Sequence, residues 1–283
     1  MKLCVLLISV KYVLKWSWFV LDIIVCVKQV PETTNVKINK DTNTIIREGN
    51  NSIINPFDLY AVEEAIRLRE ALGGNVTAIS MGIPQAEELL REVIAIGVDN
   101  AVLLSDKAFA GADTLATSYT LAAGIRKISS YDLIICGRQS TDGDTAQVGP
   151  SLAEKLEIPH VTCVSKIEEI SKDCIKCYRL IEDGYEVVEM RLPGLITVVK
   201  EINEPRLPSL FGLRKAMQAE IPIWTANDIN IDNTLCGIAG SPTYVVDTFS
   251  PNHEIENEIL NGEPEEQAKI VIDKLMKIIY KKG

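Results

Sequence analysis

The feature that most constrains this chain is a repeating alternation of short apolar runs and helical segments over residues 22–164. Each run is rich in Ile, Val and Leu, and the segment after it places apolar side chains three or four positions apart. This alternation is typical of parallel strands that are each followed by a covering helix. The predicted strands are residues 22–28, 76–81, 100–104, 132–136 and 160–164. The predicted helices are residues 57–72, 84–96, 113–127 and 144–157.

The pattern changes outside this core. Residues 33–47 alternate polar and apolar side chains around a polar turn, which predicts a β-hairpin insertion. Short alternating runs joined by polar turns follow residue 164 and indicate antiparallel strands. Prolines interrupt the chain from about Glu204 onward, and a terminal helix is predicted at 264–281. The antiparallel strands are predicted at residues 165–170, 174–181 and 185–191.

These patterns predict an α/β fold. We expect an open, mostly parallel sheet with helices on both faces, a β-hairpin insertion, a small antiparallel appendage and an extended C-terminal arm. Residues 22–220 should form the α/β domain with its appendage, and residues 221–283 should form the arm with the terminal helix.

The first 21 residues are apolar but are interrupted by Lys11 and Lys15. The apolar run is therefore shorter than the ~18 residues that a membrane span needs. No small-residue cleavage site follows it. We interpret residues 1–21 as an extension outside the fold that results from a mis-assigned start, and we expect no membrane span.

Composition disfavours one class of partner and indicates a compartment. The formal net charge is −10 and the pI is near 4.9, so the chain lacks the concentrated basic surface that binds nucleic acid. Seven cysteines, an odd number, lie mostly within apolar runs, which is typical of reduced thiols in the cytoplasm. Cys174 and Cys177 form a CxxC pair, but the two histidines, His160 and His253, lack metal-ligand spacing. We therefore expect a cytoplasmic protein with no bound metal and no nucleic-acid partner.

The most informative segment is GRQSTDGDTAQVGP at residues 137–150, between a predicted strand and a predicted helix. Gly137 and Gly143 let the backbone approach a ligand, and a helix that begins near Asp144 directs free N–H groups at it. Ligands of open α/β sheets bind outside the carboxyl ends of the strands, where this loop begins. The loop is therefore predicted to bind a phosphate group. Its donors to phosphate or ribose oxygens are Arg138, Ser140, Thr141, Thr145 and Gln147.

The two carboxylates of this loop, Asp142 and Asp144, do not suit an anion site. Each has two open interpretations, either capping or first-turn charge of the following helix, or contact with a ribose hydroxyl.

Common catalytic motifs are absent from the sequence. There is no GxGxxG, no GxxxxGK[ST] and no GxSxG. With two histidines, the chain also offers little material for a Ser–His or metal hydrolase. We therefore expect a site that holds a nucleotide, with no catalytic side chain.

Four segments resemble the beta subunits of electron-transfer flavoproteins, in the order of that family and across residues 22–230. They are VCVKQVP at 25–31, NPFDLYAVEEAIRLRE at 55–70, GRQSTDGDTAQVGP at 137–150 and RLIEDGYEVVEMRLPGLIT at 179–197. The resemblance implies a heterodimer with a larger alpha subunit that carries the main FAD, and oxidoreductase activity only within that complex. It also implies an adenine-nucleotide site in this chain. The implied site residues are Cys26, Asn55, Pro56, Phe57, Asp58, Met81, and the loop Gly137, Arg138, Gln139, Ser140, Thr141, Asp142, Gly143, Asp144, Thr145, Ala146, Gln147 and Val148.

Three further segments are similar to the electron-bifurcating members of that family. They are KQVPET at 28–33, DGDTAQVGP at 142–150 and GADTLAT, which contains Asp113 and Thr114. This similarity implies FAD in this chain, where other members hold AMP. It further implies NADH as the electron donor, with one electron passed to ferredoxin or flavodoxin and one passed through the other FAD to an acyl-CoA or related dehydrogenase. A non-bifurcating subunit with structural AMP remains the alternative.

The segment EPRLPSLFGLRKAMQ at 204–218, here called the docking segment, matches the loop with which the family contacts dehydrogenases. Leu210 takes the position of the contact leucine, and Phe211 follows it. Packing of both side chains onto their own domain is the alternative. Two other classes stay open: an ATP-binding regulatory or adenylating domain, and a CxxC thiol oxidoreductase.

Overall fold

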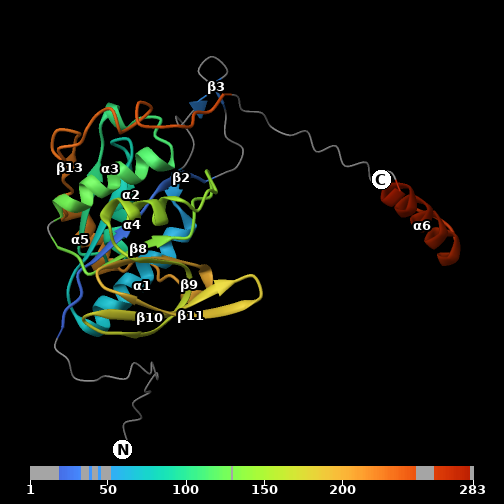
Figure 1. The fold of residues 1–283 in the computed structure, drawn as a ribbon, viewed down its shortest axis with the longest axis horizontal. Coiled ribbons are helices and arrows are strands. Elements are labelled where there is room, and N and C mark those ends of the chain that lie inside the picture. The colour runs from blue at the N-terminus through green and yellow to red at the C-terminus, as the bar shows by residue number, and fades with distance from the viewer. Residues whose placement is uncertain are drawn as a thin grey trace, which may run out of the picture. The chain divides into compact units, whose positions relative to one another are not determined.

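The computed structural model describes residues 19–32, 38–39, 44–45, 52–128, 130–246 and 258–280. The chain divides into two units, residues 1–246 and residues 247–283. The first unit is built around a nine-stranded sheet (Figure 1). Its strands are β1 (Ile23–Cys26), β6 (Val76–Met81), β7 (Asn100–Leu104), β8 (Leu133–Gly137), β9 (His160–Ile170), β10 (Cys174–Ile181), β11 (Gly184–Arg191), β12 (Gly194–Val198) and β13 (Ile223–Trp224).

The strand order is β11-β10-β9-β12-β8-β1-β6-β7-β13. All neighbouring pairs from β9 across to β13 are parallel, and only β10 and β11 at one edge are antiparallel. The predicted open, mostly parallel sheet is therefore confirmed. The predicted antiparallel appendage is continuous with the main sheet, because β9 pairs with β12 through its first half and with β10 from Val164 to its end at Ile170.

Two short antiparallel pairs stand outside this sheet. One joins β2 (Gln29–Pro31) to β5 (Ser52–Ile54). The other joins β3 (Ile38–Asn39) to β4 (Thr44–Ile45), within the segment predicted as a hairpin insertion. The remaining residues of that segment lie outside the described part of the chain.

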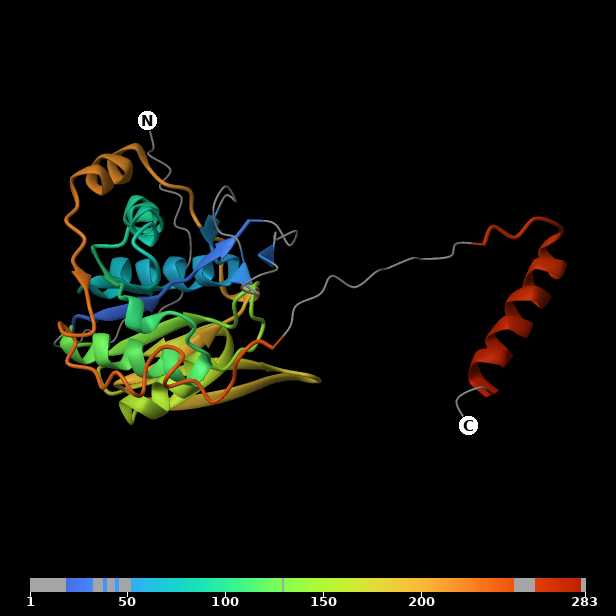
Figure 2. The same cartoon turned by 90° about the horizontal axis from the view of Figure 1, so that it is seen from above.

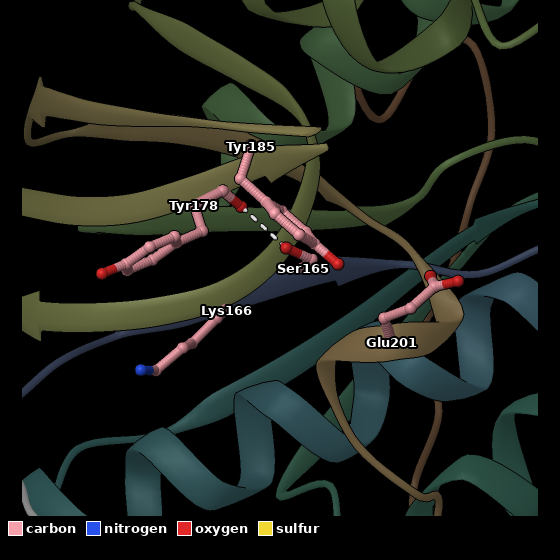
Figure 3. Close-up of a pocket in the computed structure, with 5 residues that line it drawn as sticks. All are labelled: Ser165, Lys166, Tyr178, Tyr185 and Glu201. Carbon is pink, nitrogen blue, oxygen red and sulfur yellow. Dashed lines mark hydrogen bonds between the residues drawn. The ribbon is translucent and has the colours of Figure 1, made fainter. Parts of the chain in front are cut away.

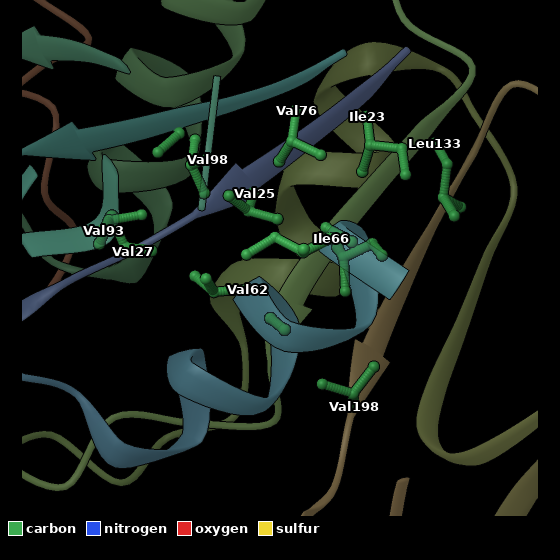
Figure 4. Packing of buried hydrophobic residues seen from close by; sticks show 14 of the residues in the cluster. Ile23, Val25, Val27, Val62, Ile66, Val76, Val93, Val98, Leu133 and Val198 are labelled. Carbon is green, nitrogen blue, oxygen red and sulfur yellow. The ribbon is translucent and has the colours of Figure 1, made fainter. Parts of the chain in front are cut away.

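Helices cover both faces of the sheet, as predicted (Figure 2). Alternate strand residues such as Val25 and Ile135 pack on α1 (Pro56–Leu72) and α2 (Ala86–Ile96), as Figure 4 shows for part of this layer. Their neighbours, such as Ile24 and Ile134, pack on α3 (Thr114–Lys127) and α4 (Val148–Leu156). Strands buried on both faces explain the continuous apolar runs of the sequence. Lys107–Phe109 and Lys200–Ile202 form the short 3-10 helices η1 and η2.

Helix α4 begins four residues later than predicted, at Val148. Asp144 and Ala146 have φ angles of 51° and 54°, in the left-handed region that a right-handed helix excludes. The two carboxylates of the loop are therefore neither caps nor first-turn charges of α4, whose N-cap is Gln147. The residues before Val148 form an open loop instead.

Strand β12 was not predicted, and it lies between β8 and β9 with hydrogen bonds to both. Its five residues, GLITV, are all buried. Pro193 precedes the strand and Gly194 is its first residue. In the sequence this pair indicates a turn.

Residues 221–246, which we expected in the C-terminal arm, belong to the first unit. Strand β13 extends the sheet next to β7. Ala226, Ile229 and Cys236 are buried on the face that α3 and α4 cover. The second unit contains α6 (Pro264–Tyr280), which confirms the predicted terminal helix. Among the described residues, no helix has the length and apolar character to cross a membrane.

The fold also begins slightly before Asp22. Leu21 is 1% exposed within the core cluster, and its N–H donates to the Gly73 carbonyl at 3.2 Å. Leu21 was expected to lie outside the fold, and this part of the interpretation is wrong. Of residues 1–18 the structure gives no description.

Leu21→Ala should lower the free energy of unfolding by about 2–5 kcal/mol, because it removes a fully buried side chain and leaves a cavity. Val20→Ala is the matched control, since Val20 is 65% exposed, and it should change stability by less than about 0.5 kcal/mol. Urea denaturation of both variants measures the difference. Equal effects would show that the chain before Asp22 does not contribute to the core.

Candidate functional site

The side of the sheet on which successive strands are placed changes between β1 and β8. Strands β1, β6 and β7 succeed one another towards one edge, whereas β8 pairs with the opposite side of β1. The loops that follow β1 and β8 therefore diverge, and open α/β sheets form their ligand crevice at such a point, at the carboxyl ends of the two strands. The predicted phosphate loop starts at Gly137, the last residue of β8, and so lies at this crevice.

Asn55, at the N-terminus of α1, connects the two loops. Its backbone N–H donates to the Lys28 carbonyl at 2.9 Å, just beyond β1. Its side-chain amide donates to the Gln139 carbonyl at 2.8 Å and accepts from the Thr141 N–H at 3.2 Å. Asn55 is 1% exposed, so these hydrogen bonds are made away from water. The residue supports the phosphate loop from beneath.

Asp58, in the first turn of α1, makes a second connection. Its Oδ2 accepts from the Lys28 N–H at 2.8 Å, and the Gly137 N–H also bonds to the carboxylate. A Cβ on residue 137 would come within 2.3 Å of Asp58 Oδ1, so only glycine fits there. Burial raises the pKa of Asp58 to about 7, against the opposing effect of the Asn55, Lys28 and Gly137 hydrogen bonds.

The loop itself is open to solvent from Thr141 to Gln147. Thr114, in the first turn of α3, donates its hydroxyl to Gln147 Oε1 at 3.1 Å, which brings this expected residue to the loop. Asp113 is used differently, because its carboxylate caps α3 through the Leu115 and Ala116 N–H groups and also accepts from Thr243. Asp113, which we expected at the nucleotide site, thus caps α3 and holds the segment after β13 in place.

The inner wall of the crevice comes from the ends of β1, β6 and β8. Cys26 ends β1 and is opposite Cys136 of β8 in the register, while Met81 ends β6. The hydrogen bond with Cys26, burial and the neighbouring charge of Asp58 raise the pKa of the Cys136 thiol well above its usual value. The Cys136 thiol therefore stays protonated at neutral pH.

Lys28 is a residue that sequence reasoning missed. Its Nζ lies 2.6 and 2.8 Å from the two carboxylate oxygens of Asp142, and 3.4 Å from Ser140 Oγ. Asp144 in turn accepts a hydrogen bond from the Gln139 amide. Both carboxylates that looked unsuited to an anion site are therefore satisfied by donors. The signal was present in the KQVPET segment, where a lysine stands two residues after the end of the first strand.

A separate hollow of about 320 Å³ lies on the antiparallel side of the sheet (Figure 3). The Ser165 hydroxyl there donates to the Tyr178 carbonyl at 3.2 Å. No residue of the expected nucleotide site lines this hollow. Its lining residues are Ser165, Lys166, Tyr178, Tyr185 and Glu201.

The CxxC pair lies on β10, and its two cysteines differ in their surroundings. Cys177 is buried, and burial raises the pKa of its thiol to about 11, so the thiol stays protonated at neutral pH. Cys174 contacts the Ser171 hydroxyl at 3.2 Å. A thiol oxidoreductase needs a stabilised thiolate, which this strand does not provide.

The second half of the docking segment forms α5 (Leu210–Gln218), with Ser209 as its N-cap. Leu210 and Phe211 are 88% and 81% exposed, so neither side chain packs on the first unit. Helix α5 lies tightly on α2, since a Cβ on Gly212 would come within 2.0 Å of the Ala95 carbonyl oxygen. Arg206 fixes the approach to α5 by bonding both Glu63 and Glu70 of α1 at 2.6–3.2 Å.

The fold and the crevice place the molecule among the doubly wound α/β proteins that bind ligands at a switch point. Residues 42–229 match the model of the electron transfer flavoprotein domain. The chain is 51% identical to the electron transfer flavoprotein subunit beta of Thermoanaerobacterium thermosaccharolyticum, over 90% of this chain and 98% of that protein. The corresponding protein of Clostridium acetobutylicum is 48% identical over 92% of this chain and its full length. Subunit CarD of the caffeyl-CoA reductase-Etf complex of Acetobacterium woodii is 50% identical over 85% of this chain and 92% of that subunit.

The chain belongs to the electron transfer flavoprotein family and is similar over 90–92% of its length to beta subunits of that family. The resemblance seen in the sequence is thereby confirmed, and electron transfer is the work of this family.

The buried Asp58 carboxylate should make stability depend on pH. Its native pKa of about 7 exceeds the ordinary value, so the native state binds the proton more tightly than the unfolded state. Stability is therefore lost as pH rises towards 7, by about 3 kcal/mol between pH 5 and 8. Asp58→Asn removes this titration.

Urea denaturation of both proteins at several pH values measures this effect. The stability advantage of the wild type over Asp58→Asn should shrink as pH rises through this window. Parallel pH profiles would show that Asp58 does not titrate there.

Proposed function

We propose that this chain is the beta subunit of a heterodimeric electron-transfer flavoprotein that holds an FAD at the β1/β8 crevice. The observation that carries the proposal is the polar loop that begins at Gly137, held at the switch point by Asn55 and Asp58. The proposed partner is an alpha subunit that carries the second FAD. CarD, at 50% identity, bears the name of an Etf-containing complex, which supports assembly with further subunits.

The residues present suit the phosphate and ribose groups of an adenine nucleotide. Arg138 is exposed, and its guanidinium forms no ion pair within the described residues, so it is available to phosphate. The exposed Thr141 and Thr145 hydroxyls and the Gln147 amide add hydrogen-bonding groups at the same loop. The absence of a Cβ at Gly137 allows the start of the loop to lie directly on α1.

A bound flavin supplies the one- and two-electron chemistry, and the protein fixes its position and tunes its potential. No acid or base at the crevice is required for this work. We propose NADH as the donor, with one electron passed to ferredoxin or flavodoxin and the other passed through the alpha subunit to an acyl-CoA or related dehydrogenase. The segments KQVPET, GADTLAT and DGDTAQVGP support this bifurcating assignment.

We also place the protein in the cytoplasm. The six cysteines in the described part of the chain are free, which suits a reducing compartment.

The purified heterodimer should release two FAD and no AMP on denaturation, as measured by chromatography of the released nucleotides. One FAD with one AMP would reject the bifurcating assignment and keep the family, whereas ATP alone would overturn both. Gly137→Ala should then reduce the yield to one FAD, because the added Cβ meets Asp58 and displaces the loop. The FAD of the alpha subunit and the thermal midpoint of the heterodimer serve as internal controls.

Leu210→Ala should raise the KM for the dehydrogenase about tenfold, because an exposed apolar anchor contributes mainly to partner contact. Val187→Ala is a matched control, since Val187 is 51% exposed on β11 at the opposite edge of the sheet. Electron delivery to the dehydrogenase is measured by steady-state kinetics with intact heterodimer. Equal effects of the two substitutions would reject a docking role for Leu210.

A further inference from the structure

Lys28 occupies a fixed place at the crevice. Its backbone is held on both sides by α1, because its N–H donates to Asp58 Oδ2 at 2.8 Å and its carbonyl accepts from the Asn55 N–H at 2.9 Å. It follows Cys26, the end of β1, by two residues. The side chain therefore projects from a rigid anchor, and its Nζ reaches the loop after β8.

The ammonium group lies on the loop that is expected to receive a phosphate. It contacts both oxygens of Asp142 at 2.6 and 2.8 Å and the Ser140 hydroxyl at 3.4 Å. Burial acts to raise the pKa of Asp142, but the Lys28 ammonium and the Ser140 hydroxyl outweigh burial and hold the pKa below its ordinary value. Asp142 thus forms an ion pair with the Lys28 ammonium group.

The charge balance of the loop makes this pair important. Lys28 and Arg138 carry the positive charges near the loop, and Asp142 and Asp144 carry the negative ones within it. The carboxyl group of Asp58, whose pKa is about 7, lies at the start of the loop. A phosphate that enters the loop needs a donor, and an ammonium is a strong one. The Lys28 side chain is 48% exposed, and ion pairs exposed to this degree contribute little to stability. Replacing the contact between Lys28 and Asp142 by a contact between Lys28 and a phosphate therefore costs little free energy.

We infer that Lys28 is a phosphate-binding residue of the nucleotide site and that Asp142 competes with the nucleotide for its ammonium group. The inference rests on the proposed function, since it needs an adenine nucleotide at this crevice. It assigns opposite effects to two residues in direct contact: Lys28 favours binding, and Asp142 opposes it. If the ion pair were purely structural, loss of either residue would disturb the loop equally. Both substitutions would then change nucleotide binding in the same direction.

The test uses heterodimer that has been depleted of nucleotide and is titrated with FAD and, separately, with AMP. Lys28→Met should weaken binding about tenfold and should flatten its dependence on salt, because a charge-assisted contact is lost. Asp142→Asn should strengthen binding about threefold. In the Lys28→Met background, Asp142→Asn should give a smaller gain, since the competition for Lys28 no longer exists. Lys172→Met, on the turn before β10, is the control and should have no effect.

The outcomes separate this inference from the proposed function. Wild-type protein that binds nucleotide while Lys28→Met binds it equally well would overturn the role of Lys28 alone. Weaker binding by both Lys28→Met and Asp142→Asn, with unchanged thermal midpoints, would identify a structural pair and would also overturn the inference. Wild-type protein that binds neither FAD nor AMP would overturn both the inference and the proposed function.

Discussion

The first turn of α1 is the constraint on which the crevice depends. Strands β1 and β8 are neighbours, but the loops that follow them lead to opposite sides and share no secondary structure. Asn55 and Asp58 join these loops through buried hydrogen bonds to Lys28, Gly137, Gln139 and Thr141. Buried polar groups of this kind are costly when unpaired, so each loop stabilises the position of the other.

The same helix also positions the docking segment. Asn203 bonds to the Tyr60 carbonyl and to Glu64, and Arg206 bonds to Glu63 and Glu70. Burial raises the pKa of Glu64, whereas at Glu63 the bonds from Arg206 and Arg67 outweigh burial and lower the pKa. One helix thus holds the predicted phosphate loop at its N-terminus and the approach to Leu210 along its side. A redox carrier needs both features at a fixed separation.

The local elements could be predicted from sequence, and the long-range ones could not. Strands 76–81 and 100–104 were predicted to the residue, because an apolar run buried on both faces is a strong signal. The start of α4 was misplaced because Asp144 and Ala146 adopt a left-handed backbone that their residue types do not announce in the sequence. Strand β12 was missed because five residues after a proline give no periodicity to detect.

In the candidate site, too, local features could be predicted from the sequence and long-range contacts could not. The loop and its location were predicted from glycine spacing and strand order, and they lie where parallel-sheet geometry requires. The support of the loop by Asn55 and the pairing of Lys28 with Asp142 join residues that are 84 to 114 positions apart. No local pattern encodes such contacts. The CxxC motif illustrates the converse, since it lies on a strand in which burial keeps the thiol of Cys177 protonated.

The position of β12 also sets an order of events during synthesis. Strands β8 and β9 follow one another along the chain, but they do not pair with each other. Residues 194–198 form β12, which lies between them and pairs with both. Until those residues leave the ribosome, both strands present open edges, which are prone to wrong pairing. The hairpin of β10 and β11 is made just before β12 and pairs locally, and local pairs form fastest. This hairpin covers the far edge of β9 while the last central strand is still being translated.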